Sequence, residues 1–160
     1  MNKAVFLDRD GVVTYDPDDY TYKLEDMHIL DGIIPLCKQL VERGFLIIVI
    51  TNQGGISKGL YTKEDVDVVH NYIETEFLKN GVKIQEFYFC PHHNKLEACL
   101  CRKPDSLLLE KALYKYNVDP TKSYFIGDKW RDIECGEKVG VKGIKIDVNK
   151  VLPELINEIV

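Results

Sequence analysis

Acidic and hydroxyl side chains gather in three short clusters, and each cluster directly follows a run of apolar residues. The clusters are Asp8-Arg9-Asp10-Gly11, Thr51-Asn52-Gln53-Gly54 and Gly127-Asp128-Lys129-Trp130-Arg131-Asp132. Carboxylates held close together repel one another unless a cation lies between them. Oxygen ligands with room for water and phosphate oxygens suit Mg²⁺, and a carboxylate can attack phosphorus to form an aspartyl-phosphate. If the clusters meet in space, they could therefore carry out phosphoryl transfer.

Residues that could hold a transferring phosphoryl group accompany these acids. We expect its oxygens to contact the hydroxyl of Thr51, the backbone N–H groups of Asn52 and Gln53, and the amine of Lys103. Phosphoryl transfer requires mainly positioning and neutralisation of charge. Each cluster taken alone could equally be an ordinary turn or a helix cap, so the prediction depends on their convergence.

Short apolar strands alternate with longer amphipathic helices along the chain. Strands are expected at residues 4–7, 45–50, 86–89, 123–126 and 143–146, and helices at residues 31–43, 62–79, 107–113, 131–139 and 151–160. This alternation predicts an α/β fold, a three-layer α/β/α domain with a mostly parallel, Rossmann-like sheet. Open sheets of this kind bind ligands at the carboxyl ends of their strands, where all three clusters lie.

The composition is that of an ordinary globular protein. A length of 160 residues predicts a single domain over residues 1–160. The formal net charge of −5 argues against nucleic acid or an anionic membrane as the main partner. We see no signal peptide, and the longest apolar run, residues 45–50, is far shorter than the ~20 residues of a membrane span. We therefore expect a cytoplasmic monomer that acts on a small molecule.

Three of the five cysteines crowd into one segment together with histidines. Cys90, His92, Cys99 and Cys101 have the spacing C-x-H-x₆-C-x-C. Three thiolates and one imidazole form a closed tetrahedral shell for structural Zn²⁺, although the same residues could be ordinary loop thiols. His93 is the rival to His92 as a ligand. Since Lys103 lies two residues after Cys101, a bound zinc ion could aim Arg102 and Lys103 at the substrate.

The three polar clusters, together with Arg102-Lys103-Pro104 as the third motif along the chain, resemble the four motifs of the haloacid dehalogenase-like hydrolases, and the resemblance spans residues 5–132. It implies that Asp8 is the nucleophile, that Asp10 protonates the leaving oxygen and then activates water, and that Thr51 and Lys103 hold the phosphoryl group. The implied Mg²⁺ ligands are Asp8, the backbone carbonyl of Asp10 and Asp128, with Asp132 behind them. No large insertion follows the first or third motif, so we expect an open site without a separate cap domain.

Within this family, the cysteine loop resembles that of two sister groups of phosphatases, which act on heptose bisphosphate and on histidinol phosphate. The run 51–59 favours the heptose group, whereas the short spacer between His92 and Cys99 is closer to the histidinol-phosphate group. We therefore expect a phosphorylated small metabolite, heptose bisphosphate ahead of histidinol phosphate. The residues expected to bind it are Arg9, Asp16, Asp19, Asn52, Gln53, Gly54, Arg102 and Lys129.

Two classes of protein other than phosphatases share part of this pattern. Signalling receivers also combine Mg²⁺, a phosphorylated aspartate, a threonine and a lysine, but they lack an acid two residues after the aspartate. Asp10 therefore discriminates against a receiver. A zinc-stabilised binding module with vestigial catalytic residues is the other alternative, and no member of the catalytic set is missing here.

Overall fold

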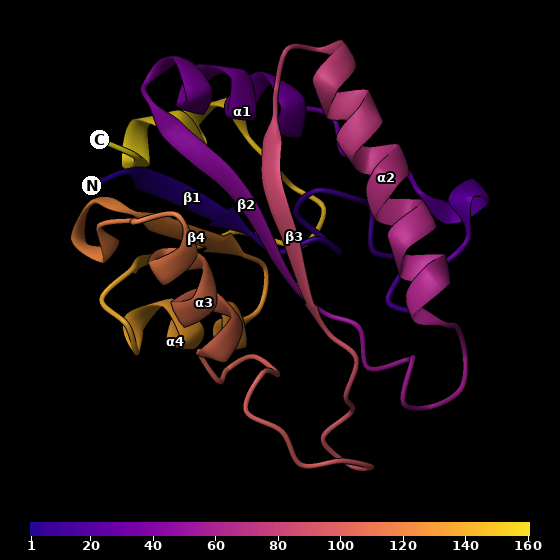
Figure 1. The fold of residues 1–160 in the computed structure, drawn as a ribbon. Coiled ribbons are helices and arrows are strands. Elements are labelled where there is room, and N and C mark those ends of the chain that lie inside the picture. The colour runs from indigo at the N-terminus through magenta and orange to yellow at the C-terminus, as the bar shows by residue number, and fades with distance from the viewer.

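Five parallel strands form one sheet, in the order β3-β2-β1-β4-β5. The computed structural model describes residues 1–160. Figure 1 shows the sheet between two layers of helices. The strands are β1 (Lys3–Leu7), β2 (Phe45–Asn52), β3 (Ile84–Cys90), β4 (Tyr124–Gly127) and β5 (Lys142–Lys145). The predicted α/β class and all five predicted strands are confirmed, to within two residues at each end.

Alternating side chains of the central strand define the two halves of the core. Val5 and Leu7 belong to the cluster on one face, together with residues of the helices at 33–42 and 63–79. Ala4 and Phe6 belong to the cluster on the opposite face, together with residues of the helices at 107–115 and 130–137. Because successive side chains of a strand point to opposite faces, a strand covered on both sides must be apolar throughout. This explains the unbroken apolar runs in the sequence.

Four helices cover the sheet, two on each face (Figure 1). They are α1 (Ile33–Glu42), α2 (Lys63–Lys79), α3 (Leu107–Lys115) and α4 (Trp130–Glu137). Thr62 caps α2 through a reciprocal pair of hydrogen bonds with Asp65. Short 3₁₀ turns complete the chain, at Leu24–Asp26, Pro120–Lys122 and Pro153–Glu158.

The helix predicted at residues 151–160 is wrong in type, because this segment forms the 3₁₀ turn Pro153–Glu158. The carbonyl oxygens of Ile156 and Ile159 accept hydrogen bonds from Nη1 of Arg43, at 3.0 and 2.6 Å. The side chains of both residues are buried against the face of the sheet that α1 covers. Tertiary contacts thus replace the intrahelical bonds that a regular α-helix would need.

Two irregular segments leave the carboxyl end of the sheet, residues 12–30 after β1 and residues 91–103 after β3. The first is closed at its base by a bridge between Thr14 and Ile29. Buried apolar residues form two clusters, one on each face of the sheet. Neither segment has a core of its own, so the prediction of no large cap domain is confirmed. The structure contains no helix with the length and apolarity needed to span a membrane.

Candidate active site

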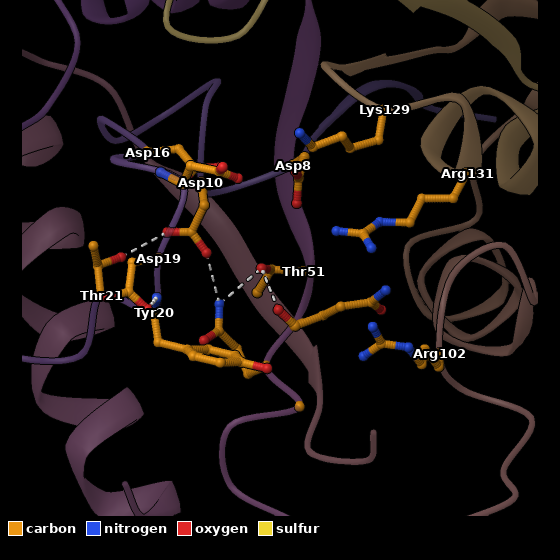
Figure 2. Close-up of a pocket in the computed structure, with 14 residues that line it drawn as sticks. Asp8, Asp10, Asp16, Asp19, Tyr20, Thr21, Thr51, Arg102, Lys129 and Arg131 are labelled. Atoms are coloured by element: carbon orange, nitrogen blue, oxygen red, sulfur yellow. Dashed lines mark hydrogen bonds between the residues drawn. The ribbon is translucent and has the colours of Figure 1, made fainter. Parts of the chain in front are cut away.

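The three polar clusters meet in one open cavity at the carboxyl end of the sheet. Its volume is about 370 Å³. Figure 2 shows Asp10, Asp16, Asp19, Thr21 and Tyr20 along one side, and Lys129, Arg131 and Arg102 along the other, with Asp8 and Thr51 between them. The predicted residues that line it are Asp8, Asp10, Asp16, Asp19, Thr51, Asn52, Gln53, Gly54, Arg102 and Lys129. Asp18 and Tyr20 line it as well, and so do Thr21 and Arg131, which were not predicted.

Lys103 forms the buried ionic centre of the site. Its Nζ lies 2.8 Å from Oδ1 of Asp8 and 2.6 Å from Oδ1 of Asp132, and it also donates a hydrogen bond to the Ile50 carbonyl. Burial favours the neutral amine, but the charges of Asp132 and Asp8 outweigh burial and hold the pKa of Lys103 above its usual value. The side chain is therefore a fixed cation at the base of the cavity.

Asp8, Asp128 and Asp132 form a compact group of carboxylates. One oxygen from each residue lies within 4.8 Å of those of the other two. Both carboxylate oxygens of Asp128 are buried and accept no hydrogen bond, although Nζ of Lys129 lies 3.6 Å from Oδ2. Burial, followed by the charges of Asp8 and Asp132, raises the pKa of Asp128 to about 7. Unpartnered, mutually repelling oxygens are what a hard cation relieves, so this donor set fits Mg²⁺.

Two contacts distinguish the role of Asp132 from that of Asp128. Oδ1 of Asp132 pairs with Lys103, and Oδ2 accepts a hydrogen bond from the N–H of Lys129 at 3.2 Å. Both oxygens are thus engaged within the protein, which agrees with a supporting position behind the metal site. Gly11 contributes to the same packing: it has φ +90°, and a Cβ there would lie 2.6 Å from Oδ2 of Asp128.

The carboxylate of Asp10 is held by donors on several sides. Oδ1 accepts hydrogen bonds from Nε of Arg9 at 3.0 Å and from the Thr21 hydroxyl at 3.1 Å. Oδ2 accepts from Nη2 of Arg9 and from Nε2 of Gln53, both at 3.1 Å. Gln53 is fixed in turn, because its Oε1 accepts a hydrogen bond from the Tyr61 hydroxyl at 2.6 Å. This network sets the position of Asp10 at the cavity wall.

Arg9 does not line the cavity, in contrast to its predicted contact with the substrate. Its side chain is 1% exposed, and besides Asp10 it donates to the Thr21 carbonyl and lies 3.4 Å from Nε2 of His70. The reason is geometric: Asp8 and Asp10 both face the cavity, so the residue between them points away from it. Arg9 is therefore a positioning residue for Asp10.

Thr51 and Asn52 stand at the end of β2, with Lys103 behind them. The side-chain amide of Asn52 makes two reciprocal hydrogen bonds to the backbone of Lys103, at 3.0 and 3.1 Å. The predicted use of the Gln53 N–H to hold a phosphoryl oxygen is wrong, because this N–H donates to the Cys90 carbonyl at 2.8 Å. Gln53 instead reaches the cavity through its side chain.

Asn149 holds the acidic loop, residues 16–19, through two hydrogen bonds to the backbone of Asp16. Oδ1 of Asn149 accepts a hydrogen bond from the Asp16 N–H at 2.7 Å, and Nδ2 of Asn149 donates to the Asp16 carbonyl at 2.8 Å. The Asn149 N–H also donates to the Gly11 carbonyl. Asn149 adopts φ +62°, a left-handed conformation that Asn tolerates better than most residues. Sequence reasoning missed Asn149, since a single Asn after a strand carries no distinctive pattern.

Arg102 and Arg131 provide the positive side of the cavity. Arg102 donates from Nη1 to the His92 carbonyl at 3.0 Å. Burial lowers the pKa of Arg102, and the nearby charge of Arg131 lowers it further. Arg131 lies in the first turn of α4, next to Asp132. That position in the last acidic motif was the signal from which Arg131 could have been predicted.

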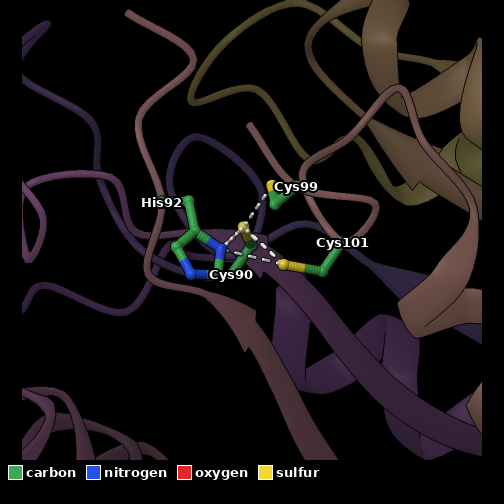
Figure 3. Close-up of side chains that lie close together, drawn as sticks. All are labelled: Cys90, His92, Cys99 and Cys101. Atoms are coloured by element: carbon green, nitrogen blue, oxygen red, sulfur yellow. Dashed lines mark hydrogen bonds between the residues drawn. The ribbon is translucent and has the colours of Figure 1, made fainter. Parts of the chain in front are cut away.

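The four predicted zinc ligands lie together, as Figure 3 shows. One possible ligand atom from each of Cys90, His92, Cys99 and Cys101 lies within 4.8 Å of those of the other three. His92 faces the thiols through Nδ1, 3.3 Å from Sγ of Cys101, while its Nε2 lies 3.3 Å from a carboxylate oxygen of Glu97. A carboxylate behind a ligating imidazole is a common arrangement at metal sites. This donor set fits structural Zn²⁺.

His93 does not belong to this cluster. Its backbone N–H donates to the Ser57 hydroxyl at 2.8 Å, and its Nδ1 accepts from the Lys95 N–H at 3.2 Å. The choice of His92 over His93 therefore agrees with the geometry.

Comparison with known proteins places the chain in a family. The HAD-hydrolase-like family model matches residues 100–157. A D-glycero-alpha-D-manno-heptose-1,7-bisphosphate 7-phosphatase of Campylobacter jejuni is 42% identical over 92% of this chain and 83% of its own length. A D-glycero-beta-D-manno-heptose-1,7-bisphosphate 7-phosphatase of Haemophilus influenzae is 33% identical over 92% and 81%.

A solved structure supports the same fold. The D,D-heptose 1,7-bisphosphate phosphatase of B. bronchiseptica, complexed with magnesium and phosphate, superposes with a TM-score of 0.81 at 24% identity, covering 98% of this chain and 99% of that one. Given this fold, the family match and the identity to relatives over most of their length, the chain belongs to the haloacid dehalogenase-like hydrolases and is a phosphatase of that family.

Proposed function

We propose that this enzyme hydrolyses the 7-phosphate of a D-glycero-D-manno-heptose 1,7-bisphosphate through a phosphorylated Asp8. The observation that carries the proposal is the buried pairing of Asp8 with Lys103 beside the carboxylate of Asp128, which accepts no hydrogen bond within the protein. The names of the relatives in Campylobacter jejuni and Haemophilus influenzae support the choice of substrate.

The first half of the reaction transfers the phosphoryl group to the protein. A carboxylate oxygen of Asp8 forms a bond to phosphorus, and the bond from phosphorus to the sugar oxygen breaks. Asp10 gives a proton to the departing sugar oxygen. Thr51 and Lys103 stabilise the charge on the phosphoryl oxygens. The dephosphorylated sugar then leaves.

The second half regenerates the enzyme. Asp10, now ionised, takes a proton from a water molecule, whose oxygen bonds to phosphorus. The bond between phosphorus and Asp8 breaks, which releases inorganic phosphate and restores both carboxyl groups. Asp8 and Asp128, with the backbone carbonyl of Asp10 that the family resemblance implies, would hold the Mg²⁺ that neutralises phosphoryl charge.

The polar lining of the cavity suits a hydroxyl-rich substrate. Tyr20 is the one hydrophobic residue among the fourteen that line it. Asp16, Asp18 and Asp19 along one side can accept hydrogen bonds from sugar hydroxyls. The open mouth agrees with the lack of a cap domain.

Hydrolysis of histidinol phosphate is the second candidate. The same three aspartates could pair with the ammonium group of that substrate, and the six residues between His92 and Cys99 favour it. Steady-state comparison of the two phosphate esters, with Mg²⁺ present, decides between them. A higher kcat/KM for heptose bisphosphate supports the proposal, and a much higher value for histidinol phosphate overturns the choice of substrate.

We also infer that the cysteine cluster binds Zn²⁺ and thereby fixes the segment that carries Arg102 and Lys103. Cys101 directly precedes Arg102. Because this loop has little core of its own, a bound metal ion would fix its conformation. Elemental analysis of protein made in metal-replete medium tests this: we expect one zinc per chain, and protein without zinc would refute the inference.

A further inference from the structure

We propose that Tyr61 is a positioning residue for the reaction, because its hydroxyl orients the side-chain amide of Gln53. That amide in turn holds two groups of the site, the carboxylate of Asp10 and the hydroxyl of Thr51. The inference rests on the proposed function in one respect: it takes Asp10 to give a proton to the leaving oxygen. It adds a buried residue that does not itself line the cavity.

Three hydrogen bonds connect Tyr61 to the cavity wall. The Tyr61 hydroxyl donates to Oε1 of Gln53 at 2.6 Å. Nε2 of Gln53 donates to Oδ2 of Asp10 at 3.1 Å and to Oγ1 of Thr51 at 3.0 Å. Figure 2 shows the last two bonds as dashed lines that join Asp10 to Thr51 through one side chain. A single amide thus links the first two polar clusters of the sequence.

The proton on Tyr61 decides which way the amide of Gln53 faces. An ionised carboxylate can only accept hydrogen bonds, so the amide nitrogen must face Asp10. The amide oxygen then faces Tyr61, which satisfies it by donating. Burial raises the pKa of Tyr61 to about 12, so the hydroxyl keeps its proton at neutral pH. Since Gln53 is 2% exposed, its amide oxygen would be buried without a partner if this donor were removed.

The orientation of the amide also sets the direction of the Thr51 proton. Because Oγ1 of Thr51 accepts a hydrogen bond from Gln53, its own O–H is left to donate elsewhere. The acceptor it has within the protein is the Asn52 carbonyl, at a long 3.4 Å. The proton is therefore available to a phosphoryl oxygen. With the amide reversed, its oxygen would compete for this proton and would repel the carboxylate of Asp10.

The ring of Tyr61 is fixed by its neighbours. It is 5% exposed and stacks on Tyr22, with ring centroids 5.0 Å apart and an angle of 14° between the planes. A Cβ at position 55 would overlap this ring, so Gly55 leaves the space that Tyr61 fills. A buried ring needs no hydroxyl in order to pack, so the bond to Gln53 accounts for a tyrosine at this position.

The test compares kcat/KM for an alkyl and an aryl phosphate in the wild type and in Tyr61→Phe. The sugar hydroxyl of heptose bisphosphate leaves only with a proton from Asp10, whereas the nitrophenolate of 4-nitrophenyl phosphate needs none. The value of kcat/KM covers the steps up to release of this first product. We expect the ratio of alkyl to aryl values to fall about tenfold in the variant, the scale of one hydrogen bond. Tyr22→Phe, in the ring stacked on Tyr61, is the matched control and should leave the ratio unchanged.

A double-mutant cycle tests whether Tyr61 acts through Gln53. Gln53→Met keeps the length of the side chain but lacks the amide, so adding Tyr61→Phe to it should lower the ratio no further. Independent losses that multiply would overturn the proposal. So would an unchanged ratio in Tyr61→Phe, even if both rates fall, because this would show a structural role only. If Tyr61→Phe does not fold, judged by circular dichroism, Gln53→Met must show the tenfold fall by itself.

Asp10→Asn separates this inference from the proposed function. It should lower the same ratio by at least as much as Tyr61→Phe does, and if it does not, the proposed role of Asp10 fails. If it does, and Tyr61→Phe leaves the ratio unchanged, only the role of Tyr61 fails. If the wild type does not hydrolyse heptose bisphosphate, the proposed substrate fails, and fructose 6-phosphate takes its place in the ratio.

Discussion

The Nζ atom of Lys103 lies 2.8 Å from Oδ1 of Asp8 and 2.6 Å from Oδ1 of Asp132. One buried ammonium group thus joins the proposed nucleophile to the last acidic motif. Both carboxylates and the amine are almost fully buried, so none of the three charges can be removed without leaving the others poorly compensated.

We predict that Lys103→Ala lowers kcat by about 10²–10³, the scale seen when one donor to a transition state is removed. The measurement is steady-state hydrolysis of an aryl phosphate at saturating Mg²⁺. Lys115→Ala, an exposed lysine on α3, is the control. A Lys103→Ala variant that folds and keeps more than a tenth of wild-type kcat would contradict the role.

The clasp between Asn149 and Asp16 predicts an effect on substrate binding. Asn149→Gly keeps the left-handed backbone conformation accessible but removes both side-chain hydrogen bonds to Asp16. We expect KM for the sugar phosphate to rise several-fold while kcat falls less, because the acidic loop loses its anchor. A fall in kcat with KM unchanged would show that the loop does not contribute to binding.

His70 predicts a pH dependence of stability. Burial, followed by the charge of Arg9, lowers the pKa of His70 from 6.5 to about 3. Between these values the unfolded chain binds a proton at His70 that the folded chain does not, so the contribution of His70 to stability is full well above pH 6.5 and falls as the pH drops toward 3. From pH 7.5 to 5.5 this contribution should fall by about 1.4 kcal/mol.

Urea unfolding of wild type and His70→Gln at both pH values measures this loss. The variant should lose about 1.4 kcal/mol less than the wild type over the same interval. His28→Gln, at an exposed histidine, should behave like the wild type. Equal pH dependence in wild type and His70→Gln would show that His70 titrates normally.

The cysteine cluster predicts a difference between two adjacent histidines. Nδ1 of His92 faces the thiols, whereas His93 contacts Ser57 and Lys95. We expect His92→Gln to lose zinc, measured by elemental analysis, and to unfold at lower temperature. His93→Gln should retain zinc. The reverse pattern would assign the fourth ligand to His93.

The sequence was sufficient to predict the strands and the convergence of Asp8, Thr51 and Asp128, because apolar runs and the ends of parallel strands follow simple rules. The prediction that Arg9 contacts the substrate was wrong because it considered the type of residue and not the direction of its side chain. A residue between two acids that face the cavity points away from it. Asn149 could not be predicted, since its contact with Asp16 spans 133 residues. The C-terminal segment was misjudged because contacts with Arg43 decide its conformation.

Three assignments remain predictions: one domain over residues 1–160, a monomer, and a cytoplasmic location. Sedimentation of the purified protein addresses the oligomeric state.

Trapping the phosphorylated enzyme tests the central claim most directly. Asp10→Asn is incubated with an aryl phosphate, whose leaving group needs no proton, then quenched in acid and mapped by peptide mass spectrometry. We predict one added phosphoryl group on the peptide that contains Asp8, and none when Asp8→Asn is combined with Asp10→Asn. A phosphoryl group on any other residue, or an unmodified Asp8 peptide in a variant that still releases the aryl alcohol, would contradict the account.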